Sequence, residues 1–421
     1  MERHLSHLCT TPAVRASASH RGGQVAADAA LAAFDVAGYA THRSVVSPAG
    51  NRGASALSPW IRHGLLDLGR VWDHVDGGPA HDVEAFRSEL LWQEYARHLY
   101  ARVGPRTRRP LRGGPSTADP ATAPPPRGDP AAGWTILDPD AACTREQVDT
   151  LLTDGWITNR GRLWLASQWS VRLGADWSAG EDLMFRSLLD GSRAANRLGW
   201  QWTSGAGSSR PWTWTREQVE RFAPDRCGSC ALRTRCPVES TPADPGHPGR
   251  TGAESGPDRT VADPELDRLL RRDPDVAGTA GPQVVTRSDA DPVRAVWLTA
   301  ESLGDADPAL AAHSELPAVF VFDEPLLARL RLASTRLVFL AECLADLGGR
   351  REVVVHLDDP VAALDGRTVA TTAAPVPGNR RIRRRLGDGV EVHPWPWLVP
   401  PHDRSVRSFS AWRRHASVPT V

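Results

Sequence analysis

The sequence contains no lysine, only two methionines and only six cysteines in 421 residues. Arginine therefore carries all of the fixed positive charge, and 50 basic residues balance 50 acidic ones. A net charge of zero excludes a global attraction to nucleic acid, so binding to DNA or RNA would need a local basic patch. The cysteines are too few and too clustered for a disulfide framework, and their clustering indicates a metal instead.

Long apolar runs are also missing. No stretch of 18 apolar residues occurs, and no hydrophobic signal core stands near the N-terminus. We therefore expect a soluble, cytoplasmic protein that does not associate with membranes, and we expect it to be monomeric. The length allows two or three domains with cores of their own.

The most informative stretch covers residues 155–214, which predict a mostly helical run rich in tryptophan. Indole rings offer flat surfaces for stacking, and a few polar side chains among them would orient a heteroaromatic ligand. The motifs in this stretch are Asn159-Arg160-Gly161-Arg162, Trp177, Asp190-Gly191, Asn196 and Gly199-Trp200-Gln201-Trp202.

In order and spacing these motifs resemble the flavin-binding core of the DNA photolyase/cryptochrome family. The resemblance implies a helical domain that binds FAD. It implies that Arg162 and Asp190 pair beside the flavin ring and that Asn196 faces flavin N5, where a neutral amide stabilises the reduced ring. It also implies that Trp200 and Trp177 are the inner members of an electron-transfer chain. The family's outer tryptophan is missing, because no tryptophan occurs between Trp92 and Trp134. Trp134, Trp156, Trp164 or a metal cluster could supply an alternative outer step.

A second motif with serines and a proline, residues 55–59, predicts the start of a helix with a serine N-cap. Such caps are structural in most proteins. The resemblance implies that this segment, together with an upstream tyrosine and the asparagine at the start of the core, contacts the cofactor. The residues so implied are Tyr39, Ser55, Ala56, Leu57, Ser58 and Asn159. Ala54 stands where the family has threonine, so one hydroxyl contact is lost.

Residues 83–101 predict an amphipathic helix on which Glu89 and Trp92 share one face. Without a family, a packing tryptophan and a solvated glutamate would explain the pair. The resemblance implies that these two residues line a pocket for a pyrimidine dimer flipped out of DNA. The full set implied for that pocket is Glu89, Trp92, Asn159, Arg160 and Trp202. Thr158 and Asn159 replace a histidine pair of the (6-4) enzymes, which favours cyclobutane dimers.

Three cysteines, Cys227, Cys230 and Cys236, form a C-x2-C-x5-C pattern followed by proline. Thiolates at this spacing suit an iron–sulfur cluster or zinc, and Cys143 is the best candidate for a fourth ligand. The layout resembles the bacterial iron–sulfur branch of the photolyase family, which implies a [4Fe–4S] cluster. Zinc remains the alternative.

From residue 294 the pattern changes to alternating buried strands and helices, which predicts a parallel α/β sheet. This part resembles the Rossmann-like antenna domain of photolyases, but here it follows the helical domain, so the chain is similar to a permuted family member. The segment from Trp297 to Leu303 lacks the family's Arg and Asp pattern, and no antenna pigment is assigned.

We thus expect an α + α/β protein. The predicted divisions are a disordered N-terminus at 1–22, a helical FAD-binding domain at 23–240 with a disordered insert at 104–133, a linker at 241–292, an α/β domain at 293–414 and a tail at 415–421.

Two functions follow from the resemblance. One is blue-light-driven repair of UV-damaged DNA by a photolyase-like lyase, with Asn196, Trp200, Trp177, Glu89 and Trp92 as its reaction residues. The other is a cryptochrome-like photoreceptor or redox flavoprotein without repair activity. The retained pocket residues favour repair, whereas the missing outer tryptophan favours the photoreceptor or redox alternative.

Overall fold

The computed structural model describes residues 2–10, 13–112, 130–208, 210–239, 263–287 and 292–419. These residues form two compact units. Unit 1 comprises Met1–Val36, Leu57–Pro105 and Arg268–Val421, and unit 2 comprises Ala37–Ala56 and Arg106–Asp267. Most of the predicted insert (113–129) and of the predicted linker (240–262 and 288–291) lies outside the described residues.

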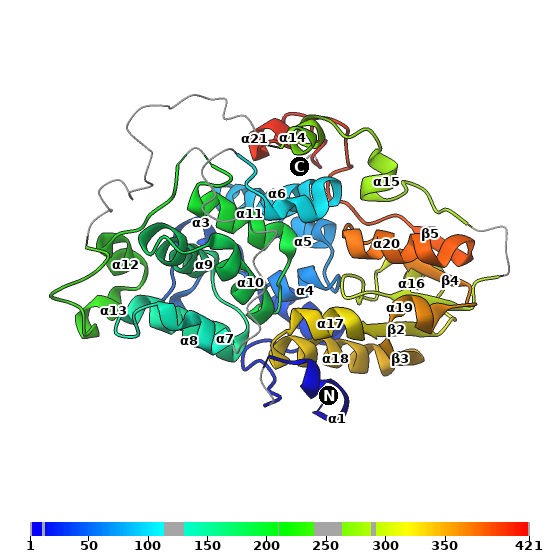
Figure 1. Cartoon of the computed structure of the whole chain (residues 1–421), viewed down its shortest axis with the longest axis horizontal. Helices are drawn as coiled ribbons and strands as arrows, with labels where there is room; N and C mark the ends of the chain where they lie inside the picture. The colour runs from blue at the N-terminus through cyan, green and yellow to red at the C-terminus, as the bar shows by residue number, and fades with distance from the viewer. Residues whose placement is uncertain are drawn as a thin grey trace. The chain divides into compact units, whose positions relative to one another are not determined.

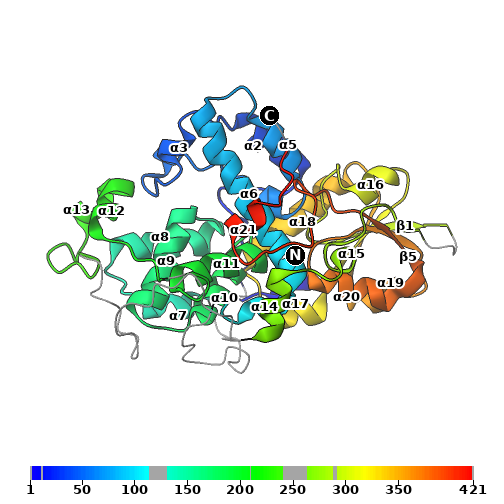
Figure 2. The same cartoon turned by 90° about the horizontal axis from the view of Figure 1, so that it is seen from above.

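Unit 1 contains a five-stranded parallel sheet in the order β3-β2-β1-β4-β5 (Figures 1 and 2). The strands are β1 (Ala295–Leu298), β2 (Ala318–Asp323), β3 (Val353–Asp358), β4 (Val369–Thr372) and β5 (Val390–His393). Every residue of β1, β4 and β5 is buried, as expected for a parallel sheet covered on both faces. The predicted α/β pattern is confirmed for this part of the chain.

Helices cover the two faces of this sheet. The helices in this C-terminal part of the chain are α15 (Val276–Ala280), α16 (Pro308–Ala312), α17 (Glu324–Leu330), α18 (Ser334–Gly348), α19 (Pro360–Leu364), α20 (Pro377–Leu386), η6 (Gly387–Gly389) and α21 (Phe409–Arg413). Val390 and Val392 pack in one core with α19 and α20. The residues that alternate with them, Glu391 and His393, point to the other face, where α16 contacts β4 and β5.

The N-terminal helices of unit 1 pack with this α/β segment. They are α1 (Glu2–Leu5), η1 (Ser6–Leu8), α2 (Gln24–Ala33), α4 (Ser58–Arg62), α5 (Leu68–His74) and α6 (Ala80–Val103). On α6, Tyr95 donates to the carbonyl of Val406 at 3.0 Å, and Glu94 accepts from the amide of Val399 at 3.1 Å. Residues 57–105 therefore group with the α/β segment, which differs from the predicted boundary at 23–240.

Unit 2 is helical. Its elements are α3 (Tyr39–His42), η2 (Ala49–Asn51), α7 (Pro130–Gly133), η4 (Trp134–Ile136), α8 (Ala142–Asp154), α9 (Asn159–Ser167), η5 (Gln168–Arg172), α10 (Trp177–Ser187), α11 (Arg193–Ser204), α12 (Arg216–Phe222) and α13 (Pro224–Ser229). Gly180 lets α10 approach the tryptophans, because an added Cβ would lie 2.3 Å from the Trp200 ring and 3.0 Å from that of Trp169.

The structure corrects two expectations of disorder, at the N-terminus and in the insert, and it shows two helices within the predicted linker. Residues 2–8 are helical rather than a disordered lead-in, and Leu8 and Cys9 are buried. Residues 104–108 form η3 (Gly104–Arg108), and the amide of Leu111 donates to Gln201. Residues 263–287 contain α14 (Pro264–Arg271) and α15. Backbone hydrogen bonds to other elements hold these segments: Thr10 donates to the carbonyl of Leu332, Arg112 to that of Ala206 and Thr286 to that of Val392. Composition does not reveal this source of order.

Within the described parts of the chain, no helix is long and apolar enough to cross a membrane.

A buried histidine on α6 makes the stability of unit 1 depend on pH. His98 accepts from Trp412 Nε1 at 3.1 Å and donates from Nε2 to the carbonyl of Val399 at 3.0 Å. Burial, helped by the charge of His402, lowers the pKa of His98 to about 3. Between pH 6.5 and 3 the unfolded chain holds a proton that the folded chain does not, so stability falls as the pH falls through this range.

We predict that His98→Gln, which can keep both hydrogen bonds, removes this acid sensitivity. The stability difference between the two proteins should change by about 5 kcal/mol between pH 7 and pH 3. Urea unfolding across this range measures it. Burial raises the pKa of neighbouring Glu94 to about 7, but Glu94 is present in both proteins and largely cancels in the difference. Identical pH profiles for the two proteins would contradict the prediction.

Candidate functional site

An ion pair connects the first two motifs of the tryptophan-rich stretch. Helix α9 begins at Asn159, and the hydroxyl of Thr158 caps it by accepting from the amide of Gly161 at 3.2 Å. One turn later Arg162 donates from Nη2 to Asp190 Oδ2 at 2.7 Å. The Asp190 side chain is 5% exposed and that of Arg162 is 24% exposed. Two residues that are 28 positions apart thus meet as predicted.

Asn196 is held by a residue that sequence reasoning missed. Its Nδ2 donates both to the backbone carbonyl of Glu181 and to Glu181 Oε1, each at 2.9 Å. Because the amide nitrogen is committed to Glu181, the Oδ1 atom of Asn196 is the one available to a ligand. Glu181 lies one turn after Trp177 on a helix whose inner face is buried. This position is the sequence feature that could have identified it.

Glu181 belongs to a network of buried charges between α10 and α11. Arg193 donates to Glu181 Oε2 at 2.6 Å and to Asp182 Oδ1 at 2.5 Å, and Arg186 donates to Asp182 Oδ2 at 2.8 Å. Burial alone would raise the pKa of Asp182, but its arginine partners hold it below the ordinary value. This network stiffens the helix pair that carries Asn196.

The predicted electron-transfer tryptophans share one apolar cluster. Trp200 is 1% exposed and donates to Met184 Sδ at 3.4 Å, and Trp177 is 9% exposed. Trp134 lies in the same cluster, edge to face with Trp169 at 5.6 Å. Trp164, another candidate for the outer step, lies in a different cluster, where it stacks on Trp214 at 4.8 Å.

The predicted phosphate segment spans the division between the units. Tyr39, Ser55 and Ala56 belong to unit 2, whereas Leu57 and Ser58 belong to unit 1. The expected serine N-cap is wrong: Leu57 is the N-cap of α4, without a side-chain cap. Ala56 has a φ of 55°, which a residue with a side chain adopts at a cost of about 1 kcal/mol or more.

Trp92 has a partner that the sequence did not predict. Its ring stacks on Phe409 of α21, with the centroids 4.0 Å apart and an interplanar angle of 10°, and it is 39% exposed. Glu89 is half-buried on the same helix. One face of the indole is therefore covered by an aromatic ring of unit 1.

The remaining pocket residues lie in unit 2, beside a group of arginines and aromatic rings. Asn159 is exposed, and Trp202 is 41% exposed with its ring 6.1 Å from that of Trp212. The Arg160 guanidinium lies over the ring of Phe222 at 4.7 Å. Burial lowers the pKa of Arg160, and the positive charges of Arg43 and Arg221 lower it further, so three cations converge here.

The four predicted metal ligands also lie in unit 2. Cys143 on α8, Cys227 on α13 and Cys236 pack against one apolar cluster, and Cys230 donates to the carbonyl of Asp140 at 3.5 Å. Burial, together with the nearby thiols of Cys230, Cys227 and Cys236, raises the pKa of Cys143 to about 12. Among the described residues no three of these sulfurs lie within 4.8 Å of one another.

A buried amide next to the motif has no protein partner. Gln147 on α8 is 1% exposed, and within the described part of the chain neither its Oε1 nor its Nε2 has a hydrogen-bond partner. It packs directly on Gly161, where an added Cβ would lie 2.3 Å from its Oε1. Buried polar atoms in native proteins find partners, so this amide fits a site that a polar ligand or water completes.

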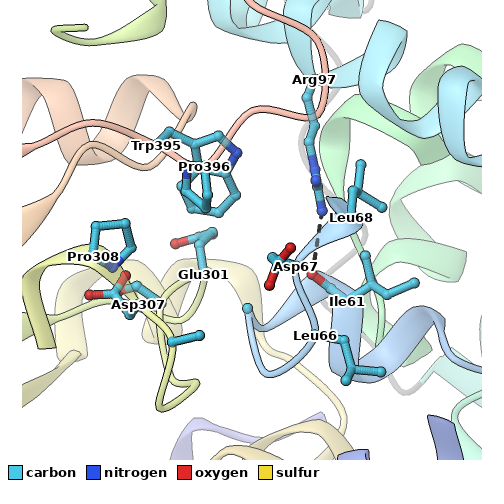
Figure 3. Close-up of a pocket in the computed structure, with 13 residues that line it drawn as sticks. Ile61, Leu66, Asp67, Leu68, Arg97, Glu301, Asp307, Pro308, Trp395 and Pro396 are labelled. Carbon is cyan, nitrogen blue, oxygen red and sulfur yellow. Dashed lines mark hydrogen bonds between the residues drawn. The ribbon is translucent and has the colours of Figure 1, made fainter. Parts of the chain in front are cut away.

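Figure 3 shows a pocket in unit 1 beyond the carboxyl end of β1, where ligands of doubly wound sheets commonly bind. Arg97 reaches the carbonyl of Ile61 at 3.3 Å, and Glu301 pairs with Arg62 at 2.8 Å. Asp307 and Trp395 help to fill the space. A volume of about 20 Å³ holds one water and is too small for a pigment.

Comparison with known proteins bears on the helical unit. Residues 140–225 match the FAD binding domain of DNA photolyase. The chain is 31% identical over 186 residues to a deoxyribodipyrimidine photo-lyase of Thermus thermophilus, covering 44% of this chain and 43% of the relative. To the Vibrio cholerae enzyme of the same name it is 30% identical over 165 residues, covering 37% and 34%.

Two solved structures are also similar. A bacterial class III photolyase from Agrobacterium tumefaciens aligns over 48% of this chain and 43% of its own, with 24% identity and a TM-score of 0.38. An archaeal photolyase from Sulfolobus tokodaii with two FAD molecules aligns over 54% and 53%, with 20% identity and a TM-score of 0.41. At these scores the likenesses add nothing to the argument.

The Arg162–Asp190 pair and Asn196 thus lie in a helical segment that matches a FAD-binding domain. Over this segment the chain is similar to proteins named deoxyribodipyrimidine photo-lyase. It spans between 34% and 43% of the length of the curated relatives named above.

We predict that Arg162→Ala lowers both stability and flavin content. It leaves the buried carboxylate of Asp190 without its arginine, at a cost of about 3–5 kcal/mol. Asp190→Asn should lower the stability less than Arg162→Ala, because it removes the buried charge as well as the ion pair. Urea unfolding and the absorbance of bound flavin per chain measure both effects.

The exposed pair Arg70–Asp28, at 2.7 Å, is the matched control. Arg70→Ala should cost no more than about 1 kcal/mol and leave the flavin content unchanged. Equal losses from Arg162→Ala and Arg70→Ala would contradict the assignment.

Proposed function

We propose that this protein is a FAD-dependent, light-driven DNA repair lyase that splits pyrimidine dimers. The observation that carries the proposal is the coincidence of the FAD-domain match at residues 140–225 with the Arg162–Asp190 and Asn196–Glu181 pairs inside it. The relatives matched over this segment have the name deoxyribodipyrimidine photo-lyase.

The cofactor would supply the electron for dimer splitting when it is reduced and excited by blue light. The Arg162–Asp190 pair would hold one edge of the flavin ring by charge-assisted hydrogen bonds. Glu181 turns Asn196 so that its Oδ1 is presented to a ligand donor. The unpartnered amide of Gln147 adds a polar contact in the same region.

The phosphates of the cofactor would be bound by the segment with Tyr39, Ser55 and Ala56, together with Leu57 and Ser58. The left-handed backbone at Ala56 supports this, because such strain is retained where a backbone must meet a ligand. Exposed Asn159 is the proposed contact from α9.

Damaged DNA would meet the arginine and aromatic group of unit 2. A chain of zero net charge needs a local patch to attract phosphates, and Arg43, Arg160 and Arg221 converge to form one. The exposed indole of Trp202 offers a stacking surface for a flipped base. Glu89 and Trp92 are the proposed contacts from unit 1, and the Trp92 side chain is exposed enough to meet a base.

The four cysteines would hold a [4Fe–4S] cluster. A tetrahedral zinc site needs sulfurs about 3.8 Å apart, given Zn–S bonds of about 2.3 Å. A four-iron cluster separates its ligands more widely, which agrees better with the absence of a close cysteine triplet among the described residues. We propose a structural or electron-transfer role for it beside the stacked pair Trp164 and Trp214.

We predict light-dependent repair of cyclobutane dimers in defined oligonucleotides by anaerobically purified, flavin-reduced protein. Trp202→Ala should lower repair at least about fivefold, because base stacking contributes about 1–3 kcal/mol. Chromatographic loss of the dimer under blue light measures this, with a (6-4) photoproduct oligonucleotide as the second substrate.

Ile136→Ala, which truncates another exposed apolar side chain of unit 2, should repair like the wild type. If flavin is bound and photoreduced but neither lesion is repaired, the proposed activity is wrong, and the protein is a photoreceptor or redox flavoprotein.

For the cysteines, we predict about four irons and four sulfides per chain after anaerobic purification, and less than half of that in Cys143→Ser. Cys343→Ser, which changes a buried thiol in unit 1, should keep the full content. Elemental analysis measures iron, sulfide and zinc together. One zinc per chain and no sulfide would exclude the cluster in favour of zinc.

A further inference from the structure

A cluster of two histidines and one glutamate in unit 1 takes no part in the proposed flavin and DNA chemistry. Glu391 and His393 lie two residues apart on β5 and share the face that α16 covers. His313 is the C-cap residue of α16. Three side chains from two elements, separated by nearly eighty positions in sequence, therefore meet at the edge strand of the sheet.

The three side chains converge on one oxygen atom. Nε2 of His313 lies 2.7 Å from Glu391 Oε1, and Nε2 of His393 lies 2.8 Å from the same atom. The two imidazole rings are 5.7 Å apart at an angle of 82°. Among the residues that the structure describes, this is the one group of three His, Cys, Asp or Glu ligand atoms within 4.8 Å of one another.

We propose that His313, Glu391 and His393 bind one divalent transition-metal ion, with Zn²⁺ as the first choice. The protein supplies two imidazole nitrogens and one carboxylate oxygen, and a fourth position is left for water or an external ligand.

The donor set selects the class of metal. Ca²⁺ and Mg²⁺ prefer shells of oxygen atoms only, whereas imidazole nitrogen suits zinc, copper, iron and nickel. Two histidines and one carboxylate are a donor set found around zinc and non-haem iron.

The spacing of the donors is close to what such an ion requires. With bonds of about 2.0–2.1 Å and tetrahedral angles, neighbouring ligand atoms lie about 3.3 Å apart. Each nitrogen–oxygen distance must open by roughly 0.6 Å from the metal-free value. Binding replaces the two Nε2 protons that now point at Glu391 Oε1, and each neutral ring then carries its proton on Nδ1.

Burial and access are both suitable for a metal. Glu391 is 6% exposed and His393 is 4% exposed, so two ligands are shielded from water. The His313 side chain is 22% exposed, which gives an ion a path to the site and leaves room for water on that side.

One cation already lies nearby. Arg287 Nε is 3.5 Å from Glu391 Oε2, the carboxylate oxygen that the histidines do not contact. Its side chain is 78% exposed, so its charge is screened by water and its position is not held by packing. Arg287 therefore leaves Oε1 to the metal, and its removal should not weaken binding.

The test is a titration of the full-length protein with Co²⁺, followed by visible absorption, because cobalt spectra distinguish nitrogen and oxygen ligands from thiolates. The protein is titrated with its cysteine site already filled, so that added metal does not report on the thiols. We expect about one equivalent bound with weak ligand-field bands and no new sulfur-to-cobalt charge-transfer band. Zn²⁺ should displace the cobalt.

His313→Ala is the first variant, because this side chain is partly exposed and its loss opens no core cavity. It should weaken cobalt binding at least tenfold, as should His393→Gln and Glu391→Gln. The controls are Arg287→Ala, which removes the neighbouring charge, and His81→Ala, which removes an exposed histidine on α6. Both should bind like the wild type. Circular dichroism verifies that each variant is folded.

Stabilisation of the fold by bound metal gives a second readout that does not depend on spectra. Added Zn²⁺ should raise the thermal midpoint of the wild type and of the two controls, but not that of the three ligand variants. If cobalt binds equally to wild type and His313→Ala, or if no ligand-field bands form at saturating cobalt, the cluster is a hydrogen-bonded core element and the proposal is wrong. If the only bands are those of thiolate ligands, the proposal is equally excluded.

Discussion

Both units depend on the burial of carboxylates beside arginine, histidine or an amide. An ionised carboxylate away from water must be paired, and this chain has no lysine to do so. In unit 2 the pairs are Asp190 with Arg162 and Glu181 with Arg193, and both connect segments of the helical unit. In unit 1 Glu391 meets two histidines instead. The same electrostatic requirement thus shapes the proposed flavin site and the proposed metal site.

The tryptophan-rich helices of unit 2 combine two kinds of rigidity. Close apolar packing brings Trp200 and Trp177 into one cluster, and Gly180 permits the approach. Charge-assisted hydrogen bonds orient Asn196 through Glu181, a residue that touches the site only through its neighbour. A bound ring keeps a fixed orientation when the residues that contact it are themselves held rigid by neighbouring residues.

Much of the candidate site could be predicted from motif spacing. The pairing of Arg162 with Asp190 is confirmed, because both lie at fixed offsets from helix starts whose caps, Thr158 and Ser192, can be read locally. The roles proposed for these residues stay predictions. The stacking of Phe409 on Trp92 could not be predicted, because the two residues are more than three hundred positions apart and no local rule connects them.

The sequence alone determined the helices of the tryptophan-rich stretch and the parallel α/β character of the C-terminal segment, because periodicity and caps are local properties. Tertiary structure alone decided that residues 57–105 pack with the α/β segment, through buried hydrogen bonds such as Tyr95 to Val406. It also decided that His313 meets Glu391 and His393. Such meetings depend on how a sheet edge and a helix end are placed in space, and a linear pattern carries no information about that placement.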